Sequence, residues 1–125
     1  MARHNDTGKW GEELAADLLR GKGYAIMERD WHSGHRDIDI IARSPDGRTV
    51  VFVEVKTRTQ DVVMRPEDAV TAKKIRSIGL AANNYVKMHN LPDELRFDIV
   101  SVVGENPQVA KAEHLPGAFN PLLFF

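Results

Sequence analysis

Three charged residues stand in strand-like surroundings and have the side chains to do chemistry together. Asp39 lies in the apolar segment 38–42, and Glu54 and Lys56 lie in the β-branched segment 49–57. Carboxylate oxygens are the ligands that hard divalent cations prefer, and an ammonium beside them can orient water or offset charge that develops on a phosphate. The residue types therefore indicate a site that binds a divalent metal ion and hydrolyses a phosphodiester.

The alternation of side chains along a strand groups these residues. Side chains two positions apart point to the same face of a strand, so Glu54 and Lys56 lie on one face. In segment 36–42 the same rule places Asp37 and Asp39 on one face and the isoleucines at 38 and 40 on the other. Each of the two segments thus presents acidic side chains on one face.

The turn between the two segments decides whether the carboxylates meet. Residues 44–48 have the composition of a turn, because proline fixes φ and glycine accepts a positive φ. If Asp46 and Gly47 form a two-residue turn, Asp39 lies directly opposite Glu54, with Cβ atoms about 5 Å apart. A slip of two residues would leave them diagonal on one face, and a slip of one would separate them. We predict that they share one face.

A purely structural interpretation of the same hairpin also exists. Asp39 and Glu54 could simply pair with Lys56 and Arg58 across an exposed sheet face, which is worth about 1 kcal/mol or less per pair. Acidic motifs of this kind are common, so the hairpin alone supports the metal site and the ion pairs about equally.

Composition limits the remaining possibilities. With 125 residues, 42% of them hydrophobic, the chain suits one domain spanning residues 1–125. The absence of cysteine excludes disulfides and thiolate metal sites. Neither a leader-like apolar segment nor a membrane-spanning stretch is present in the sequence, so we expect a cytoplasmic protein with no membrane contact.

The net charge of −1 gives no support for indiscriminate binding to nucleic acid, so a polyanion site must be local. The candidate cations follow Glu54 in the sequence and are Lys56, Arg58, Arg65, Lys73, Lys74 and Arg76. A charge cluster on a helix is more often its solvated face than a phosphate contact. The neighbouring acids raise the support for a phosphate contact until the two interpretations are about equally supported.

The elements that carry these residues follow from periodicity and turn signals. The patterns predict helices over 6–22, capped by Asp6 or Thr7, and over 66–89, with strands over 24–31, 36–42, 49–57 and 96–103 and a short last strand over 109–114. A long helix between strands favours a crossover, so we expect an α/β fold with a mixed sheet of four to five strands flanked by helices, in the order αβββαβ(β).

The segments between and around these elements complete the prediction. Residues 32–35 and 60–65 are expected as loops, and the apolar tail 122–125 is expected to dock on the domain or on a partner. Glu12 lies at the edge of the first helix's apolar face and should project along the seam between helix and sheet, whereas Glu13 should face solvent.

Five ordered sequence blocks cover most of the chain. They are GKWGEELA at 8–15, IDIIA at 38–42, VFVEVKTR at 51–58, VTAKK at 70–74 and RFDIV at 96–100. With these blocks the chain resembles the restriction-endonuclease-like, or PD-(D/E)XK, nuclease superfamily. More narrowly, it resembles the small bacterial YraN-type family, which is related to archaeal Holliday-junction resolvases. The resemblance implies a restriction-endonuclease-like sheet.

The resemblance also implies roles for single residues. Asp39 and Glu54 would bind Mg²⁺ or Mn²⁺, Lys56 would assist the attacking water, and Glu12 would complete the acidic cluster. Lys73 falls where the family also keeps a lysine and would contact a phosphate.

Two functions fit this pattern. The first is a metal-dependent DNA endonuclease or resolvase-like hydrolase acting on branched or single-strand-bearing DNA, for which a homodimer would match the near two-fold symmetry of a four-way junction. The second is a non-catalytic module that keeps the nuclease frame and binds nucleic acid or a protein partner. Near-neutral charge, the apolar tail and Arg36, which stands beside the site where the family usually has glycine, motivate the second.

Overall fold

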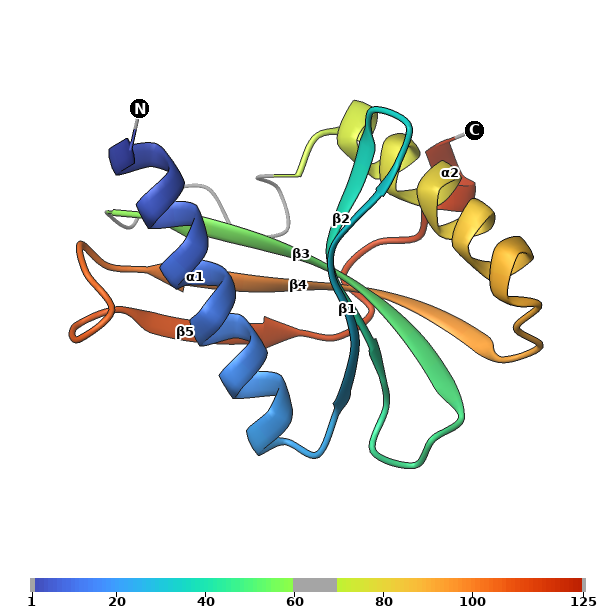
Figure 1. Ribbon diagram of the computed structural model, residues 1–125, viewed down its shortest axis with the longest axis horizontal. Helices are drawn as coiled ribbons and strands as arrows, with labels where there is room; N and C mark the ends of the chain where they lie inside the picture. Colours follow the sequence, from blue (N-terminus) through green and yellow to red (C-terminus); the bar gives the residue numbers. More distant parts are fainter. Residues whose placement is uncertain (1, 60–69, 125) are drawn as a thin grey trace.

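The structure of the protein is a computed structural model that describes the backbone of residues 2–59 and 70–124 and the side chains of residues 8–59 and 70–122 (Figure 1). The elements, in chain order, are α1 (Ala2–Gly21), β1 (Ala25–Ser33), β2 (Arg36–Arg43), β3 (Thr49–Arg58), α2 (Ala72–His89), β4 (Glu94–Val103), β5 (Lys111–Leu115) and the short 3₁₀ helix η2 (Pro121–Phe124). The predicted α/β class and the predicted order of elements are confirmed.

The strands form one mixed sheet in the order β1-β2-β3-β4-β5. All neighbours are antiparallel except β3 and β4, which run parallel and are joined by the crossover through α2. The helices α1 and α2 lie on opposite faces of the sheet (Figure 1). This is the mixed sheet flanked by helices that the long helix between strands predicted.

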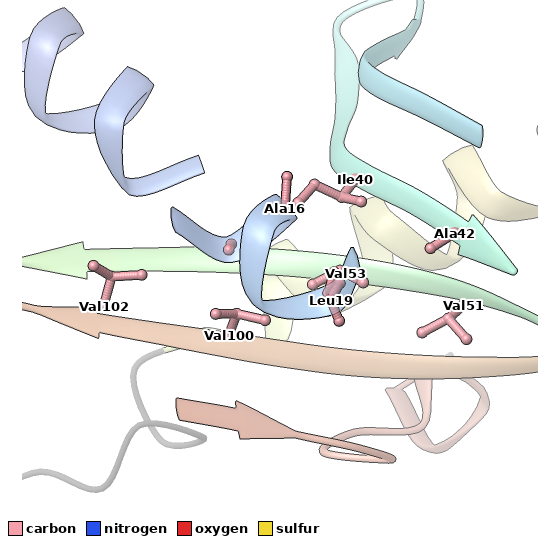
Figure 2. Close-up of a cluster of buried hydrophobic side chains, with 9 residues drawn as sticks. Ala16, Leu19, Ile40, Ala42, Val51, Val53, Val100 and Val102 are labelled. Carbon is pink, nitrogen blue, oxygen red and sulfur yellow. The ribbon is translucent and has the colours of Figure 1, made fainter. Parts of the chain in front are cut away.

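Each helix covers its own part of the core. Figure 2 shows the part under α1, where small and branched side chains fill the space between helix and sheet: Ala16, Leu19, Ile40, Ala42, Val51, Val53, Val100 and Val102. On the other face, Ile78 and Tyr85 of α2 pack against Ile41 and Phe52. Burying such a side chain contributes about 1.5–3 kcal/mol, so both helices are held firmly over the strands that carry the acids.

The helix boundaries differ from the predicted ones. The first helix begins at Ala2, so the prediction of a cap at Asp6 or Thr7 is wrong. The second helix begins at Ala72 rather than at 66, because Thr71 is its N-cap and accepts a hydrogen bond from the Lys74 N–H at 3.2 Å. Residues 60–69, which include the predicted loop 60–65, the predicted helix start and Arg65, lie outside the described residues.

Two of the remaining predictions need smaller corrections. β1 continues to Ser33, so His32 is a strand residue and only Gly34, with φ +64°, and His35 form the turn before β2. The last strand is Lys111–Leu115 rather than 109–114. At the C-terminal end, η2 lies against α2, which agrees with the expected docking of the tail on the domain. Within the described ranges, neither long helix is apolar enough to cross a membrane.

Candidate metal centre

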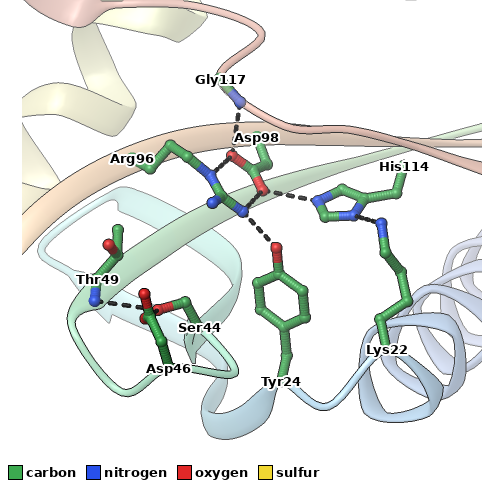
Figure 3. A network of polar contacts seen from close by, with 9 residues as sticks. All are labelled: Lys22, Tyr24, Ser44, Asp46, Thr49, Arg96, Asp98, His114 and Gly117. Carbon is green, nitrogen blue, oxygen red and sulfur yellow. Dashed lines mark hydrogen bonds and ion pairs between the residues drawn. The ribbon is translucent and has the colours of Figure 1, made fainter.

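The β2–β3 turn fixes the register of the acids. Ile40 pairs with Val53 in the register that the prediction used, and beyond this last pair the side chains of Asp39 and Glu54 lie within hydrogen-bonding reach of each other. The predicted two-residue turn is wrong, because the Gly47 N–H donates to the Ser44 carbonyl at 2.8 Å and the turn spans residues 44–47. Around this turn, Ser44 Oγ accepts from the Thr49 N–H and donates to Asp46 (Figure 3). The longer turn preserves the register and therefore the facing carboxylates.

Asp39 occupies the point where β2 parts from β3. The paired residues end at Ile40 and Val53, and beyond them Asp39 Oδ2 accepts a hydrogen bond from the Val55 N–H at 2.8 Å. Past this point the β1–β2 hairpin turns away from β3 (Figure 1). The side chain of Asp39 thus replaces a main-chain partner at the place where the sheet opens, so acids from both sides of the sheet can approach it.

The prediction that Ile38 and Ile40 share a face of the sheet is wrong. Ile38 packs in the cluster under α2 and Ile40 in the cluster under α1, so they do not share a face. In the partner strand β1 the register shifts between Ile26 and Glu28, and Asp30 has φ +51°. Bulges of this kind increase the local twist of a strand pair, which breaks the simple alternation on which the prediction relied.

The helix α1 brings Glu12 to the opening in the sheet. A Cβ atom at Gly11 would overlap Thr57 Oγ1, so only glycine lets α1 lie this close to β3. The side chain of Glu12 is 17% exposed and that of Glu13 is 62% exposed. The prediction that Glu12 projects along the seam and Glu13 into solvent is confirmed.

Asp30 is a member of the site that the sequence did not reveal. Carboxylate oxygens of Glu12, Asp30 and Asp39 all lie within 4.8 Å of one another, a spacing that could hold a metal ion. Glu12 and Asp30 also line a cleft of about 560 Å³, whose other walls come from Lys9, Trp10, Glu13 and Arg29. The cleft gives Glu12 and Asp30 an approach from solvent.

Burial and mutual repulsion dominate the electrostatics of the site. Burial, followed by the charge of Asp39, raises the pKa of Glu54 to about 8. The same two causes raise the pKa of Glu12 to about 8. Burial also raises the pKa of Asp39, although the hydrogen bond from Val55 opposes it. Acids that hold protons near neutral pH in this way lack sufficient positive charge around them.

One lysine lies closer to the acids than predicted. Lys74 Nζ is 3.0 Å from Asp37 Oδ1, and its charge lowers the pKa of both Asp39 and Glu54. Lys56 acts on the pKa of Glu54 more weakly. Both ammonium groups therefore lower the pKa of acids in the site, although the sequence predicts Lys74 only as a contact to nucleic acid.

The other predicted cations lie outside the acidic cluster. Lys73 and Arg76 are exposed on the first turns of α2, and Arg58 is half-buried at the end of β3. Arg36 pairs with Ser33 beside the β1–β2 turn, and in the part of the chain that the structure describes no ion pair links it to an acid of the site. The guanidinium that does approach the site is Arg29, at 3.8 Å from Glu12.

The donor set fits a hard divalent cation. Glu54 Oε1 is buried and has no hydrogen-bond partner within the described residues. An orphaned buried oxygen of this kind costs about 1–3 kcal/mol, and it lies next to Asp39, which could share an ion with it. All candidate ligands are carboxylates, which suit Mg²⁺ or Mn²⁺.

Comparison with known proteins relates the chain to a bacterial family. The sequence model of the uncharacterised protein family UPF0102 matches residues 11–102. The chain is 45% identical over 124 residues to a UPF0102 protein of Porphyromonas gingivalis, covering 98% of this chain and 90% of the relative. It is 42% identical to a UPF0102 protein of Bacteroides fragilis, covering 99% and 100%, and 43% identical to one of Flavobacterium psychrophilum, covering 95% and 98%.

Among solved structures, the chain is similar to Pyrococcus furiosus SfsA in complex with Ca²⁺. The TM-score is 0.36 at 14% sequence identity, and the match covers 91% of this chain and 64% of that protein. A similarity of this degree supports no argument about function. The evidence for function is therefore the set of sequence blocks that resemble the PD-(D/E)XK nucleases, together with the acids at the opening in the sheet.

Proposed function

The chain belongs to the uncharacterised protein family UPF0102, and we propose that it is a metal-dependent DNA endonuclease or resolvase-like phosphodiester hydrolase. The observation that carries the proposal is the contact between the carboxyl groups of Asp39 and Glu54 beyond the last pair of β2 and β3, where a buried Glu54 oxygen has no partner among the described residues. The order of the sequence blocks that resemble the PD-(D/E)XK nucleases supports it.

In this proposal Asp39 and Glu54 hold Mg²⁺ or Mn²⁺, and Glu12 completes the acidic cluster. The ion would lower the pKa of water and polarise the scissile phosphate. Lys56, on the face of β3 that carries Glu54, orients the attacking water and offsets charge on the phosphate. Glu12, whose pKa is about 8, can hold or release a proton at neutral pH.

The substrate in this proposal is branched or single-strand-bearing DNA. Arg58 at the end of β3 and the exposed Lys73 and Arg76 in the first turns of α2 supply cations outside the acidic cluster, and contacts of this kind to phosphates position a duplex without reading its sequence. We further propose that residues 1–125 form a single cytoplasmic domain and that two copies of it form a homodimer. Light scattering on the purified protein would test the homodimer.

The test is cleavage of labelled four-way junction, flap and single-stranded DNA with Mg²⁺, with Mn²⁺ and with a chelator. We expect metal-dependent cleavage that Asp39→Asn abolishes. Asp17→Asn, which removes a 69% exposed acid from α1, is the matched control and should cleave normally. A wild-type protein that cuts none of these substrates with either ion would contradict the proposal.

A non-catalytic binding module is the second candidate, and the two protein cations beside the site, Arg29 at 3.8 Å from Glu12 and Lys74 at 3.0 Å from Asp37, favour it. These cations offset part of the acids' charge, which a metal ion would otherwise offset. Calorimetry distinguishes the two candidates. Metal affinity that Asp39→Asn abolishes supports the enzyme, whereas DNA binding that is indifferent to both metal and Asp39→Asn supports the module.

A further inference from the structure

Lys74 reaches from α2 toward the acids of the candidate metal centre. Its Nζ lies 3.0 Å from Asp37 Oδ1, and its own N–H donates to Thr71 Oγ1, which places it in the first turn of the helix. Lys73 next to it is exposed. Two adjacent lysines with the same side-chain chemistry therefore lie in different surroundings.

The position of Lys74 is unfavourable apart from these acids. The first turn of α2 contains no acidic residue, and a cation at the N-terminal end of a helix opposes the helix dipole. Burial alone would lower the pKa of Lys74, but the charge of Glu54 and the hydrogen bond to Asp37 raise it above the usual value. The attraction of the acids therefore outweighs the cost of burial.

We propose that Lys74 is an internal counter-ion of the metal-binding acids: it offsets part of their charge in the metal-free protein and moves away when a divalent ion binds. This inference rests on the proposed function, because it requires Asp39 and Glu54 to be metal ligands. A divalent ion at these carboxylates removes the charge that attracts the ammonium and repels it directly. The side chain of Lys74 is 36% exposed, so it can turn toward solvent without opening the core.

A counter-ion of this kind competes with the metal. Removing its charge should therefore strengthen metal binding, which damage to the fold cannot do. Lys74→Met removes the ammonium and keeps most of the length of the side chain. Lys87→Met, at an exposed lysine in the last turn of the same helix, changes the net charge of the protein by the same amount and is the matched control.

The experiment is calorimetric titration of each purified, DNA-free protein with Mn²⁺. We expect Lys74→Met to bind Mn²⁺ about tenfold more tightly than the wild type, because one nearby positive charge is removed from a low-dielectric site. Lys87→Met should stay within about twofold, as exposed charges are well screened. In thermal unfolding with a chelator, Lys74→Met should melt below Lys87→Met, and saturating Mn²⁺ should remove the difference.

The outcomes separate the inference from the proposed function. If the wild type binds Mn²⁺ and Lys74→Met binds it equally or more weakly, the counter-ion role is wrong and the metal site stands. A wild type and a Lys74→Met variant that both bind no Mn²⁺ would overturn the metal site and the counter-ion role together.

Discussion

Two buried acidic groups of this protein are treated in opposite ways. Asp98 on β4 is fully buried and accepts hydrogen bonds from Arg96, from His114 at 2.7 Å and from the Gly117 N–H at 2.9 Å (Figure 3). Glu54 on β3 lies at the opening beside Asp39 and keeps a buried oxygen without a partner among the described residues. We call Asp98 with its partners the complete group, because both of its carboxylate oxygens accept hydrogen bonds. Glu54 with Asp39 is the incomplete group, because one of its oxygens could still bind a ligand.

The pKa values of the two groups express this difference. Burial alone would raise the pKa of Asp98, but the hydrogen bonds from Arg96, His114 and Gly117 hold it below its usual value. For Glu54, burial and the charge of Asp39 act in the same direction, so its pKa rises to about 8. The comparison teaches that burial by itself does not mark a functional acid, whereas burial without compensation does.

The largest predicted effect tests the complete group. Asp98→Ala leaves the Arg96 guanidinium and the His114 ring, which is 2% exposed, without their buried partner. Breaking a buried ion pair in this way costs about 3–5 kcal/mol. We therefore expect urea unfolding to show a loss of that size for the variant.

Asp39→Asn provides the contrast in the same measurement. Because it removes repulsion at the opening in the sheet, the metal-free variant should be at least as stable as the wild type. If Asp39→Asn lost as much stability as Asp98→Ala, the distinction between a complete and an incomplete group would be wrong.

The next effect tests the incomplete group. Glu54→Gln removes a predicted ligand, so we expect Mn²⁺ affinity to fall by about 100-fold or more. The amide also abolishes the charge repulsion with Asp39, so the unfolding free energy of the metal-free protein at pH 8 should not fall. Calorimetry and urea unfolding on the same preparation measure both quantities, and a Glu54→Gln variant that binds Mn²⁺ like the wild type would remove Glu54 from the site.

The sequence predicted the complete group less well than the incomplete one. Proline, aspartate and glycine in 44–48 fix the register of neighbouring strands, so Asp39 and Glu54 could be placed opposite each other from local signals. Asp98 gave no such signal, because apart from Arg96 on its own strand its partners are His114 on β5 and Gly117 in the loop after β5. Only the three-dimensional arrangement shows that it is satisfied.

The members of the site that were missed depend on the three-dimensional arrangement of the backbone. Asp30 reaches the acids through a positive φ and a register shift in β1, which side-chain alternation does not anticipate. Lys74 lies one turn before Ile78, on the buried side of α2, whereas Lys73 is exposed. Helical spacing separates the two lysines in this way, but only the packing of α2 on the sheet shows that Asp37 lies beside Lys74.

The two groups should also respond oppositely to pH. Glu54 holds a proton in the folded state up to pH about 8, whereas an unfolded glutamate releases it near 4.5. The folded state therefore binds more protons between these values, and the stability of the metal-free protein should fall as pH rises through this window. Asp98, with a lowered pKa, stabilises the fold above its ordinary value of 3.8 and loses that contribution as pH falls below it.

Thermal unfolding between about pH 3 and pH 9 with a chelator measures this dependence. We expect the highest melting temperature at mildly acidic pH, a fall toward about pH 9 that Glu54→Gln reduces, and a fall below about pH 4 that Glu54→Gln leaves unchanged. Stability that increases steadily from about pH 5 to pH 8 would show that the acids at the opening are compensated after all.

The smallest effect distinguishes two adjacent acids on α1. Glu12 lies within 4.8 Å of Asp39 and Asp30 in the cleft, while Glu13 is exposed and pairs with Arg29 at 3.0 Å. Glu12→Gln should weaken Mn²⁺ binding by about tenfold, as expected for a group that supports the principal ligands. Glu13→Gln loses only an exposed ion pair and should leave the affinity within about twofold. Equal losses for both would mean that the overall negative charge of the cleft attracts the ion, and that the close approach of α1 at Gly11 does not position a ligand.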